Sequence, residues 1–318
     1  MGSPCVLITD YIKNQDIEKK ILKDKLSGTL NSDIEVLLVW HEHITKKYID
    51  NLPKLKGIVR YGVGYDAIDL EYAKSKNIYV CNTPDYGTEE VSDTAIAMIM
   101  NIARGISRYD CLCRNYRNNW QENTITSIKR INDNKLGVIG AGRIGGSVIL
   151  KANALRFDTS FYDPYVPNGY EKMLNAKRVR SLEDLLKISD IVSINCPLSK
   201  ETFGMIDEKF ISKMKDGASF SNTARGEIIR DIDVFYEPLK SGKLSNVALD
   251  VIPHEPPKES LLINAWRNRE DWLDGRFILN PHTAYYSDKA YFEMRYKAAL
   301  NARRILNNEK PFNIVNGL

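Results

Sequence analysis

The sequence predicts an α/β protein built from two successive units, each with a parallel β-sheet covered by helices on both faces. Short runs rich in Val, Ile and Leu alternate with charged amphipathic stretches from the start of the chain. Strands that alternate with helices form βαβ units and a parallel sheet. The runs are almost continuously apolar, which is typical of strands buried on both sides. A glycine-rich turn at residues 140–145 then opens a second series of the same kind.

The first series is expected to form four short strands with amphipathic helices between them. The strands lie at residues 6–9, 36–40, 58–61 and 79–81, and the helices include residues 17–26 and 70–76. A long helix follows from Thr88 to about Tyr109, with Glu89 and Glu90 in the first turn, where negative charge suits the helix dipole. Residues 115–133 are polar and weakly patterned, and no element is predicted in their centre.

The second series is expected to form six strands and a terminal helix. The strands lie at residues 136–139, 159–162, 191–195, 218–222, 247–250 and 277–279, with helices at 143–156, 182–188 and 207–214. Pro238 should kink or shorten the helix in which it falls. The last helix, residues 287–307, carries Tyr291, Met294, Ala298 and Ile305 in one apolar stripe and is expected to pack on the first unit. The predicted domains are therefore residues 1–100 with 285–318, and residues 101–284.

Composition excludes several classes of protein. The 318 residues suffice for two domains, and 45 basic against 41 acidic residues leave a net charge of +4. The excess is spread along the chain without the basic stripe typical of a nucleic-acid binder. The longest apolar run, near residues 95–103, is too short to span a membrane. The cysteine count is odd, and Cys111 and Cys113 are too close for a CxxC motif, so neither a disulfide framework nor a metal site is predicted. A reducing, cytoplasmic compartment is therefore expected.

The glycine-rich turn predicts a dinucleotide site because of its context. Gly140-Ala-Gly142-Arg-Ile-Gly145 follows a predicted strand and opens a predicted helix. The first glycine permits the turn, the second lets the backbone approach a pyrophosphate, and the third allows close packing of helix on sheet. Arg143 and Ile144 lie at the helix N-terminus, where N–H groups and the dipole bind anions, so both are expected to touch the pyrophosphate.

The cofactor is expected to be NAD. Asp163 ends the next strand, where a carboxylate can accept hydrogen bonds from the ribose hydroxyls. The same charge would repel the 2′-phosphate of NADP, and no Arg or Lys follows directly. The alternative is a turn of this shape that binds no cofactor.

Three polar residues follow three predicted strands of the second series. Arg225, in Asn222-Thr-Ala-Arg225-Gly, has a planar guanidinium suited to a carboxylate. His282 follows Pro281 at a strand end and is the best placed of the four histidines for acid/base work, because α/β active sites lie at the carboxyl ends of strands. Glu255 could pair with His282, hold its tautomer and favour its protonated form. Reduction of a 2-keto acid needs such a carboxylate-binding cation and a tuned general acid.

These motifs together resemble the D-isomer-specific 2-hydroxyacid dehydrogenase family. The glycine turn, Asp163, the Asn222–Gly226 and Asp250–Pro256 segments and Pro281-His282 occur in the family's order and at similar spacing. Two further segments, which begin at Arg60 and at Asn82, match its first domain. The resemblance covers nearly the whole chain, and its local character is nearest to the branch that contains the C-terminal binding proteins.

The resemblance implies two Rossmann-like doubly wound domains: a flavodoxin-like substrate domain formed by both chain ends, and a central NAD-binding Rossmann domain. Arg225, Glu255 and His282 match the catalytic residues of the family, and the substrate is a small 2-hydroxy or 2-keto acid. Members are commonly dimers joined through the cofactor domain, so a homodimer is expected. The remaining matches are substrate-binding residues Arg60, Val63 and Gly64, and cofactor contacts Cys196, Pro197, Thr202, Thr223, Ala224 and Asp250.

Departures from the family pattern bear on the substrate more than on the mechanism. Glu227 replaces a usual glycine, Arg230 a small or acidic residue, and Tyr285-Tyr286 follow the catalytic histidine segment. Residues 258–274 are a polar insertion, interpreted as a lid, an oligomer contact or a plain loop. An alternative function is an NAD(H)-sensing regulatory protein on the same scaffold. Glyoxylate, hydroxypyruvate, branched or aromatic keto acids and phosphorylated acids all remain candidate substrates.

Overall fold

The computed structural model describes residues 4–10, 12–114, 116, 120–125 and 128–318, and it divides the chain into two units. One unit contains Met1–Gly87 and Tyr286–Leu318, and the other contains Thr88–Tyr285. One domain formed by both chain ends was also expected from the sequence. The prediction set the first border inside helix α4 (Thr88–Arg104), whereas the observed border precedes this helix. The reason is packing, because Ala95, Met98 and Ile99 of α4 lie in a core of the second unit.

The first unit has a five-stranded parallel sheet in the order β2-β1-β3-β4-β5. This is the flavodoxin-like order, in which β2 is added on one side of β1 and the later strands are added on the other side. Its strands are β1 (Val6–Ile8), β2 (Leu26–Ser27), β3 (Val36–Val39), β4 (Gly57–Arg60) and β5 (Tyr79–Cys81). Its helices are α1 (Asp16–Leu22), η1 (Lys23–Lys25), α2 (Lys46–Asp50), α3 (Leu70–Ser75) and α12 (Asp288–Leu306).

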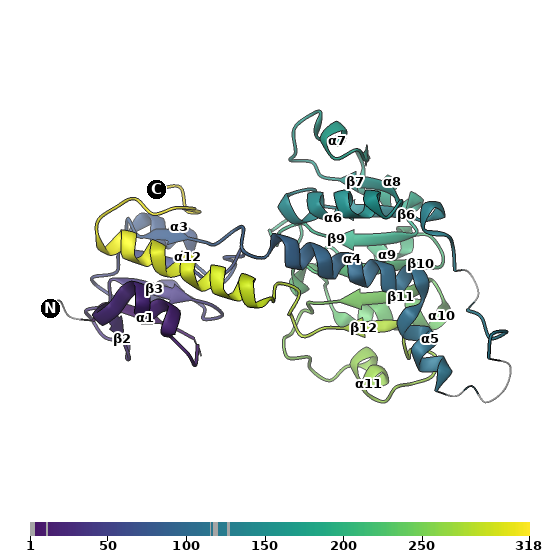
Figure 1. The fold of residues 1–318 in the computed structure, drawn as a ribbon, viewed down its shortest axis with the longest axis horizontal. Helices are drawn as coiled ribbons and strands as arrows, with labels where there is room; N and C mark the ends of the chain where they lie inside the picture. The colour runs from purple at the N-terminus through teal and green to yellow at the C-terminus, as the bar shows by residue number, and fades with distance from the viewer. Residues whose placement is uncertain (1–3, 11, 115, 117–119, 126–127) are drawn as a thin grey trace. The chain divides into compact units, whose positions relative to one another are not determined.

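Both faces of this sheet are buried, as the continuous apolar runs predict. Leu38 and Val59 point to a core that includes Met294 and Ala298 of α12, whereas Leu37 and Ile58 belong to a second core on the opposite face. Alternate residues of a strand point to opposite faces, so each strand supplies both cores. Figure 1 shows α12 beside α1 in this unit. The prediction that the last helix packs on the first unit is confirmed.

The second unit has a seven-stranded parallel sheet in the order β12-β11-β10-β9-β6-β7-β8. This is the Rossmann order, in which the direction of strand addition reverses once, between β6 and β9. Its strands are β6 (Lys135–Ile139), β7 (Asp158–Tyr162), β8 (Lys177–Arg178), β9 (Ile191–Ile194), β10 (Ala218–Asn222), β11 (Leu244–Leu249) and β12 (Phe277–Leu279).

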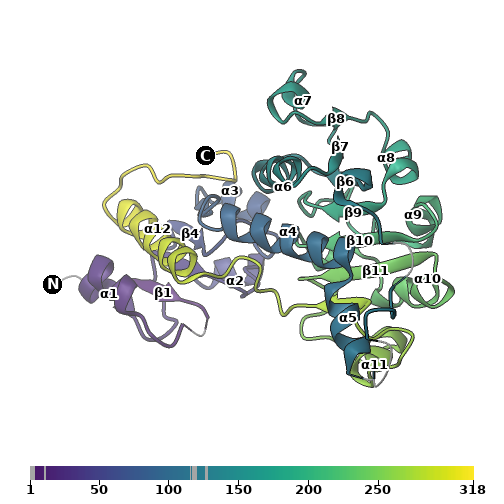
Figure 2. The same cartoon turned by 45° about the vertical axis from the view of Figure 1, so that its right-hand side comes forward.

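Helices cover both faces of the second sheet. On one face α4 and α6 lie side by side, as both views in Figures 1 and 2 show. The helices are α4, α5 (Ile106–Cys113), α6 (Arg143–Ala154), α7 (Tyr170–Met173), α8 (Leu182–Ile188), α9 (Glu208–Lys213), α10 (Tyr236–Ser241) and α11 (Leu261–Arg267). Short 3₁₀ helices are η2 (Ile131–Asp133), η3 (Gly226–Ile228) and η4 (Ile232–Phe235). Among the described residues, no helix has the length and apolar character needed to cross a membrane.

Two local expectations need correction or refinement. The helix expected from Thr88 to about Tyr109 is broken at Gly105, whose φ of 64° is left-handed and ends α4 before α5 begins. Pro238 lies in the first turn of the six-residue helix α10, where a proline removes no intrahelical hydrogen bond. The predicted lack of structure in the centre of residues 115–133 falls partly outside the described residues.

The insertion at residues 258–274 is a packed structure. It contains α11, whose first N–H groups donate to the carboxylate of Asp233 at 2.8 and 3.0 Å. Just beyond it, the guanidinium of Arg276 donates to four backbone carbonyls that come from α10, β11 and the end of the insertion. These acceptors, at 2.8 to 2.9 Å, are Leu239, Leu244, Ser245 and Trp272. One side chain therefore fastens three segments.

Replacing Arg276 with Met should lower the free energy of unfolding by about 3 kcal/mol, because several half-buried carbonyls lose a charged donor. Chemical denaturation followed by far-UV circular dichroism measures this. The matched control is Arg269→Met, since Arg269 is exposed and pairs with Asp274 at 3.2 Å. That change should lower the free energy of unfolding far less, because exposed ion pairs contribute little to stability. Equal effects of the two substitutions would contradict the fastening role of Arg276.

Candidate active site

The three predicted catalytic residues follow three neighbouring strands. Arg225 follows β10, Glu255 lies in the loop after β11, and His282 follows β12. These strands are adjacent and parallel in the order β10-β11-β12. Their carboxyl ends therefore lie at one edge of the sheet, which is where α/β proteins bind ligands.

Glu255 and His282 form a direct pair. The Nδ1 atom of His282 lies 2.7 Å from Oε2 of Glu255, while Oε1 accepts from the N–H of Ile252 at 3.2 Å. The two side chains are 42% and 38% exposed, so the pair is open to a ligand. A carboxylate against Nδ1 leaves Nε2 as the ring atom that can face a substrate.

Asp250 holds the backbone of His282. Its carbonyl oxygen accepts from the N–H of His282 at 2.8 Å, and its carboxylate accepts from the N–H groups of Thr283 and Ala284 at 3.0 to 3.1 Å. The side chain is 2% exposed, and burial raises the pKa of this carboxyl, an effect that the N–H groups of Ala284 and Thr283 partly offset. The resemblance implies a cofactor contact for Asp250. The structure adds a positional role that the sequence reasoning missed.

Arg225 lies in a turn that is fixed by its neighbours. The side chain of Asn222 accepts from the N–H of Ala224 and donates to the carbonyl of Arg225, both at 2.9 Å. A Cβ on Gly226 would come within 1.9 Å of the carbonyl oxygen of Ile252, so the loops after β10 and β11 are in backbone contact. Asn222 was named from the sequence only as part of a motif. Its position at the end of the strand is the signal that could have identified it as a residue that shapes this turn.

The glycine turn has the shape that a dinucleotide requires. Gly140 has a φ of 86°, and a Cβ there would lie 2.6 Å from the backbone nitrogen of Cys196. A Cβ on Gly145 would lie 1.9 Å from the carbonyl oxygen of Gly140. At Gly142, the N-cap of α6, a Cβ would meet nothing within 4 Å. The first and third glycines are thus needed by the turn itself, and the second leaves the helix N-terminus open to a ligand. Arg143 and Ile144 begin α6 at this point.

The carboxylate of Asp163 accepts hydrogen bonds that stabilise this turn. Its Oδ2 accepts from the N–H of Ala141 and its Oδ1 from the N–H of Tyr165, both at 2.8 Å. A carboxylate has about four lone-pair sites, so acceptors remain for ribose hydroxyls. The predicted place of Asp163 at the end of β7 is confirmed, and its role toward the ribose stays a prediction.

Two buried polar atoms at the neighbouring strand ends have no partner among the described residues. They are Oγ1 of Thr223, after β10, and Oδ1 of Asn195, after β9. Because an unpaired buried polar atom costs about 1–3 kcal/mol, both atoms indicate a ligand that would supply a partner. Together with the open face at Gly142, they fit a bound dinucleotide. Asn195 was not singled out by the sequence, although it directly follows a buried strand.

The loop predicted to cover the cofactor is held by hydrogen bonds between its own residues. Thr202 donates through Oγ1 to the carbonyl of Pro197 at 2.7 Å and accepts from the N–H of Ser199 at 2.8 Å. Burial raises the pKa of the Cys196 thiol to about 12, so this cysteine is neutral at ordinary pH. Cys196 therefore acts through its backbone contact with the glycine turn and not as a thiolate.

The predicted substrate-binding residues of the first unit lie at the end of β4. Arg60 is the last residue of that strand, and Val63 and Gly64 follow. The side chain of Asn82 donates to the carbonyl of Val63 at 2.7 Å, and Thr83 accepts from the N–H of Gly62 at 2.7 Å. The backbone N–H groups of Val63 and Gly64 donate to no residue that the structure describes.

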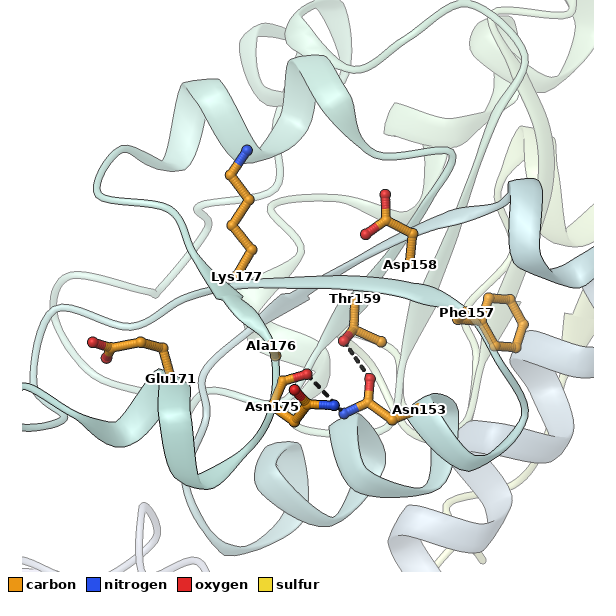
Figure 3. A pocket seen from close by; sticks show the side chains of 8 residues that line it. All are labelled: Asn153, Phe157, Asp158, Thr159, Glu171, Asn175, Ala176 and Lys177. Carbon is orange, nitrogen blue, oxygen red and sulfur yellow. Dashed lines mark hydrogen bonds between the residues drawn. The ribbon is translucent and has the colours of Figure 1, made fainter.

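A pocket elsewhere in the second unit is separate from this site. It has a volume of about 430 Å³, and Figure 3 shows its lining side chains around Asn153. Asp158 and Thr159, which line it, begin β7, so the pocket lies at the amino end of that strand, opposite to the glycine turn. Asn153 is already engaged, because it donates to the carbonyls of Leu174 and Asn175 at 2.8 and 3.1 Å.

Two curated relatives align over almost the whole chain. A D-3-phosphoglycerate dehydrogenase from Methanocaldococcus jannaschii is 31% identical over 312 residues, which cover 98% of this chain and 57% of the relative. The chain thus spans little more than half the length of that relative. A glyoxylate reductase from Pyrococcus horikoshii is 30% identical over 305 residues, covering 94% of this chain and 87% of the relative.

Solved structures show the same architecture. The crystal structure of a D-lactate dehydrogenase from Aquifex aeolicus, complexed with NAD and lactic acid, matches with a TM-score of 0.83 and 28% identity over 99% of both chains. Residues 96–284 match the family model described as the NAD-binding domain of the D-isomer specific 2-hydroxyacid dehydrogenases. None of these matches points to the C-terminal binding protein branch in particular. The chain belongs to the D-isomer specific 2-hydroxyacid dehydrogenase family, and its second unit is an NAD-binding domain.

Proposed function

We propose that this protein is an NAD-dependent dehydrogenase that interconverts a small D-2-hydroxy acid and its 2-keto acid. The observation that carries the proposal is the 2.7 Å pair of His282 and Glu255, at the sheet edge that also presents Arg225 and the glycine turn. A general acid, a carboxylate partner and a guanidinium are the groups that reduction of a keto acid requires.

When bound, the nicotinamide supplies or accepts the hydride. In the direction of reduction, His282 donates a proton from Nε2 to the carbonyl oxygen as the carbon becomes tetrahedral, and the product is the 2-hydroxy acid. Glu255 accepts from Nδ1–H, which fixes the tautomer and stabilises the protonated ring. In the opposite direction His282 takes the hydroxyl proton as a base.

Arg225 is proposed to bind the substrate carboxylate and polarise the carbonyl oxygen. Arg225 is half-buried, and its Nη1 donates to the carbonyl of Ala224 at 2.8 Å. The planar guanidinium carries five N–H donors in a fork that matches the geometry of a carboxylate. In the first unit, we propose that the N–H groups of Val63 and Gly64, with Arg60 at the strand end, bind substrate oxygen atoms. Two adjacent backbone donors that have no acceptor among the described residues suit an anion.

The same scaffold could sense NADH without turnover, so one assay decides the class of function. Purified protein is given NADH and a panel of 2-keto acids that includes glyoxylate, hydroxypyruvate, pyruvate, branched and aromatic acids and a phosphorylated acid. We expect NADH oxidation with at least one of them. Saturable NADH binding without NADH oxidation by any acid of the panel would contradict the enzyme proposal and favour a sensor.

The cofactor site yields a prediction at Gly142. A methyl group there meets no protein atom, so Gly142→Ala should leave the thermal midpoint unchanged. It should nevertheless raise the dissociation constant of NADH by about tenfold, because the methyl occupies the face that the pyrophosphate approaches. Fluorescence titration measures this. Gly28→Ala, also in open space but in the first unit, is the control. Unchanged NADH affinity in Gly142→Ala would show that the pyrophosphate lies elsewhere.

His282 should be replaced by Asn, because Asn tolerates the left-handed backbone that His282 adopts at a φ of 54°. Turnover should fall about 10²–10⁴-fold, since the general acid is lost. NADH affinity should stay within about twofold. His254→Asn, an exposed histidine of the Glu255 loop, should leave both quantities unchanged. A collapse of NADH affinity in His282→Asn would instead assign His282 a structural role.

Asp163→Asn should narrow the preference for NADH over NADPH by about tenfold, because the charge that repels a 2′-phosphate is removed while an acceptor remains for the turn. The ratio of kcat/KM for the two cofactors measures this. Asp158→Asn, at the opposite end of the same strand, is the matched control. If the ratio does not change in Asp163→Asn, this carboxylate does not discriminate between the cofactors.

A further inference from the structure

A buried charged network lies in the first unit, and none of its side chains was given a role above. The carboxylate of Glu18, on α1, is 0% exposed. It accepts from Nε of Arg295, on α12, at 2.9 Å, from Nη2 of the same arginine at 2.5 Å, and from the phenol of Tyr61 at 2.9 Å. Tyr61 is 0% and Arg295 4% exposed.

Tyr61 connects this network to the loop after β4. It directly precedes Gly62, whose φ of 125° is open to few residues other than glycine. Its own N–H donates to the carbonyl of Val39 at 2.7 Å. Asn82 and Thr83 hold the other side of the loop. The backbone at residues 61–64 is thus fixed by β3, by residues 82–83 and, through the phenol, by two helices.

A contribution to folding stability does not by itself explain why these charged groups are buried together. Removing two charges from water costs several kcal/mol per ion, and apolar residues of similar volume often serve a core equally well. Burial and the charge of Glu18 raise the pKa of the Tyr61 phenol well above its usual value, so this hydroxyl stays a donor at every ordinary pH. What the network supplies is one fixed orientation for Tyr61.

We propose that Glu18 and Arg295, acting through Tyr61, are positioning residues for the substrate-binding N–H groups of Val63 and Gly64. This inference rests on the function proposed above. The Glu18 carboxylate fixes the phenol, the phenol fixes the start of the loop, and the loop aims two donors at the substrate. None of the three side chains touches the substrate.

The test is Tyr61→Phe in the full-length holoenzyme. This change removes one hydroxyl and leaves the Glu18–Arg295 pair intact. The KM for the best 2-keto acid should rise about tenfold, because the two N–H groups lose their alignment. The dissociation constant of NADH and the kcat should stay within about twofold. A merely structural role for Tyr61 would lower the thermal midpoint without this split between KM and kcat.

Tyr72→Phe is the matched control, because the phenol of Tyr72 also donates to a carboxylate, that of Asp50, but on the exposed surface of the same unit. It should change no kinetic constant. Absence of turnover in the wild type would overturn the proposed function and this inference together. Wild-type turnover with an unchanged KM in Tyr61→Phe would overturn the inference alone.

A second variant covers the case in which Tyr61→Phe does not fold. Glu18→Leu combined with Arg295→Met removes both charges at once, which proteins commonly tolerate, and deprives the phenol of its acceptor. The same rise in KM is expected. A folded double variant with the wild-type KM would refute the positioning role.

Discussion

The candidate site depends on one buried residue, Asp250. Its N–H donates to the carbonyl of Asn222, its own carbonyl accepts from the N–H of His282, and its carboxylate accepts from Thr283 and Ala284. These bonds join the loops that follow β10, β11 and β12. Because the loops are joined through the backbone, the position of each proposed catalytic side chain is tied to that of the others, which is the kind of preorganisation that catalysis requires.

The bonds of Asp250 also explain how His282 keeps an uncommon backbone conformation. A non-glycine residue at a φ of 54° is disfavoured by about 1–2 kcal/mol and persists where the surroundings determine it. Here three consecutive N–H groups, those of His282, Thr283 and Ala284, all donate to Asp250. The turn directs the imidazole toward Glu255. Local strain at this residue is thus balanced by the hydrogen bonds that place the proposed general acid.

The sequence predicted the longer strands better than it predicted the small helices, and it missed only the two-residue strands β2 and β8 among the described strands. Parallel strands buried on both faces leave a continuous apolar run, and polar residues in the turns that follow, such as Arg225 and His282, indicate the proposed functional edge. Helices α2, α7 and α11 were missed because four to seven residues are too few to show a helical period. The break at Gly105 was missed because a single glycine inside a long amphipathic pattern is compatible with a continuous helix. The pairing of Tyr61, Glu18 and Arg295 could not be predicted, since it joins residues that only the tertiary fold brings together.

The two units hold their functional backbone groups by different means, and this difference explains why the reaction is easier to identify than the substrate. In the second unit, close contacts leave no room for a Cβ at Gly140, Gly145 or Gly226, so the residues that define the turns are visible in the sequence. In the first unit, side chains hold the loop after β4, and many side-chain combinations could do so. Exposed departures such as Glu227 do not disturb the backbone contacts that position the loops of the proposed catalytic residues. The chemistry is therefore set by backbone geometry that glycines reveal, whereas substrate preference depends on side chains that can change without altering the fold.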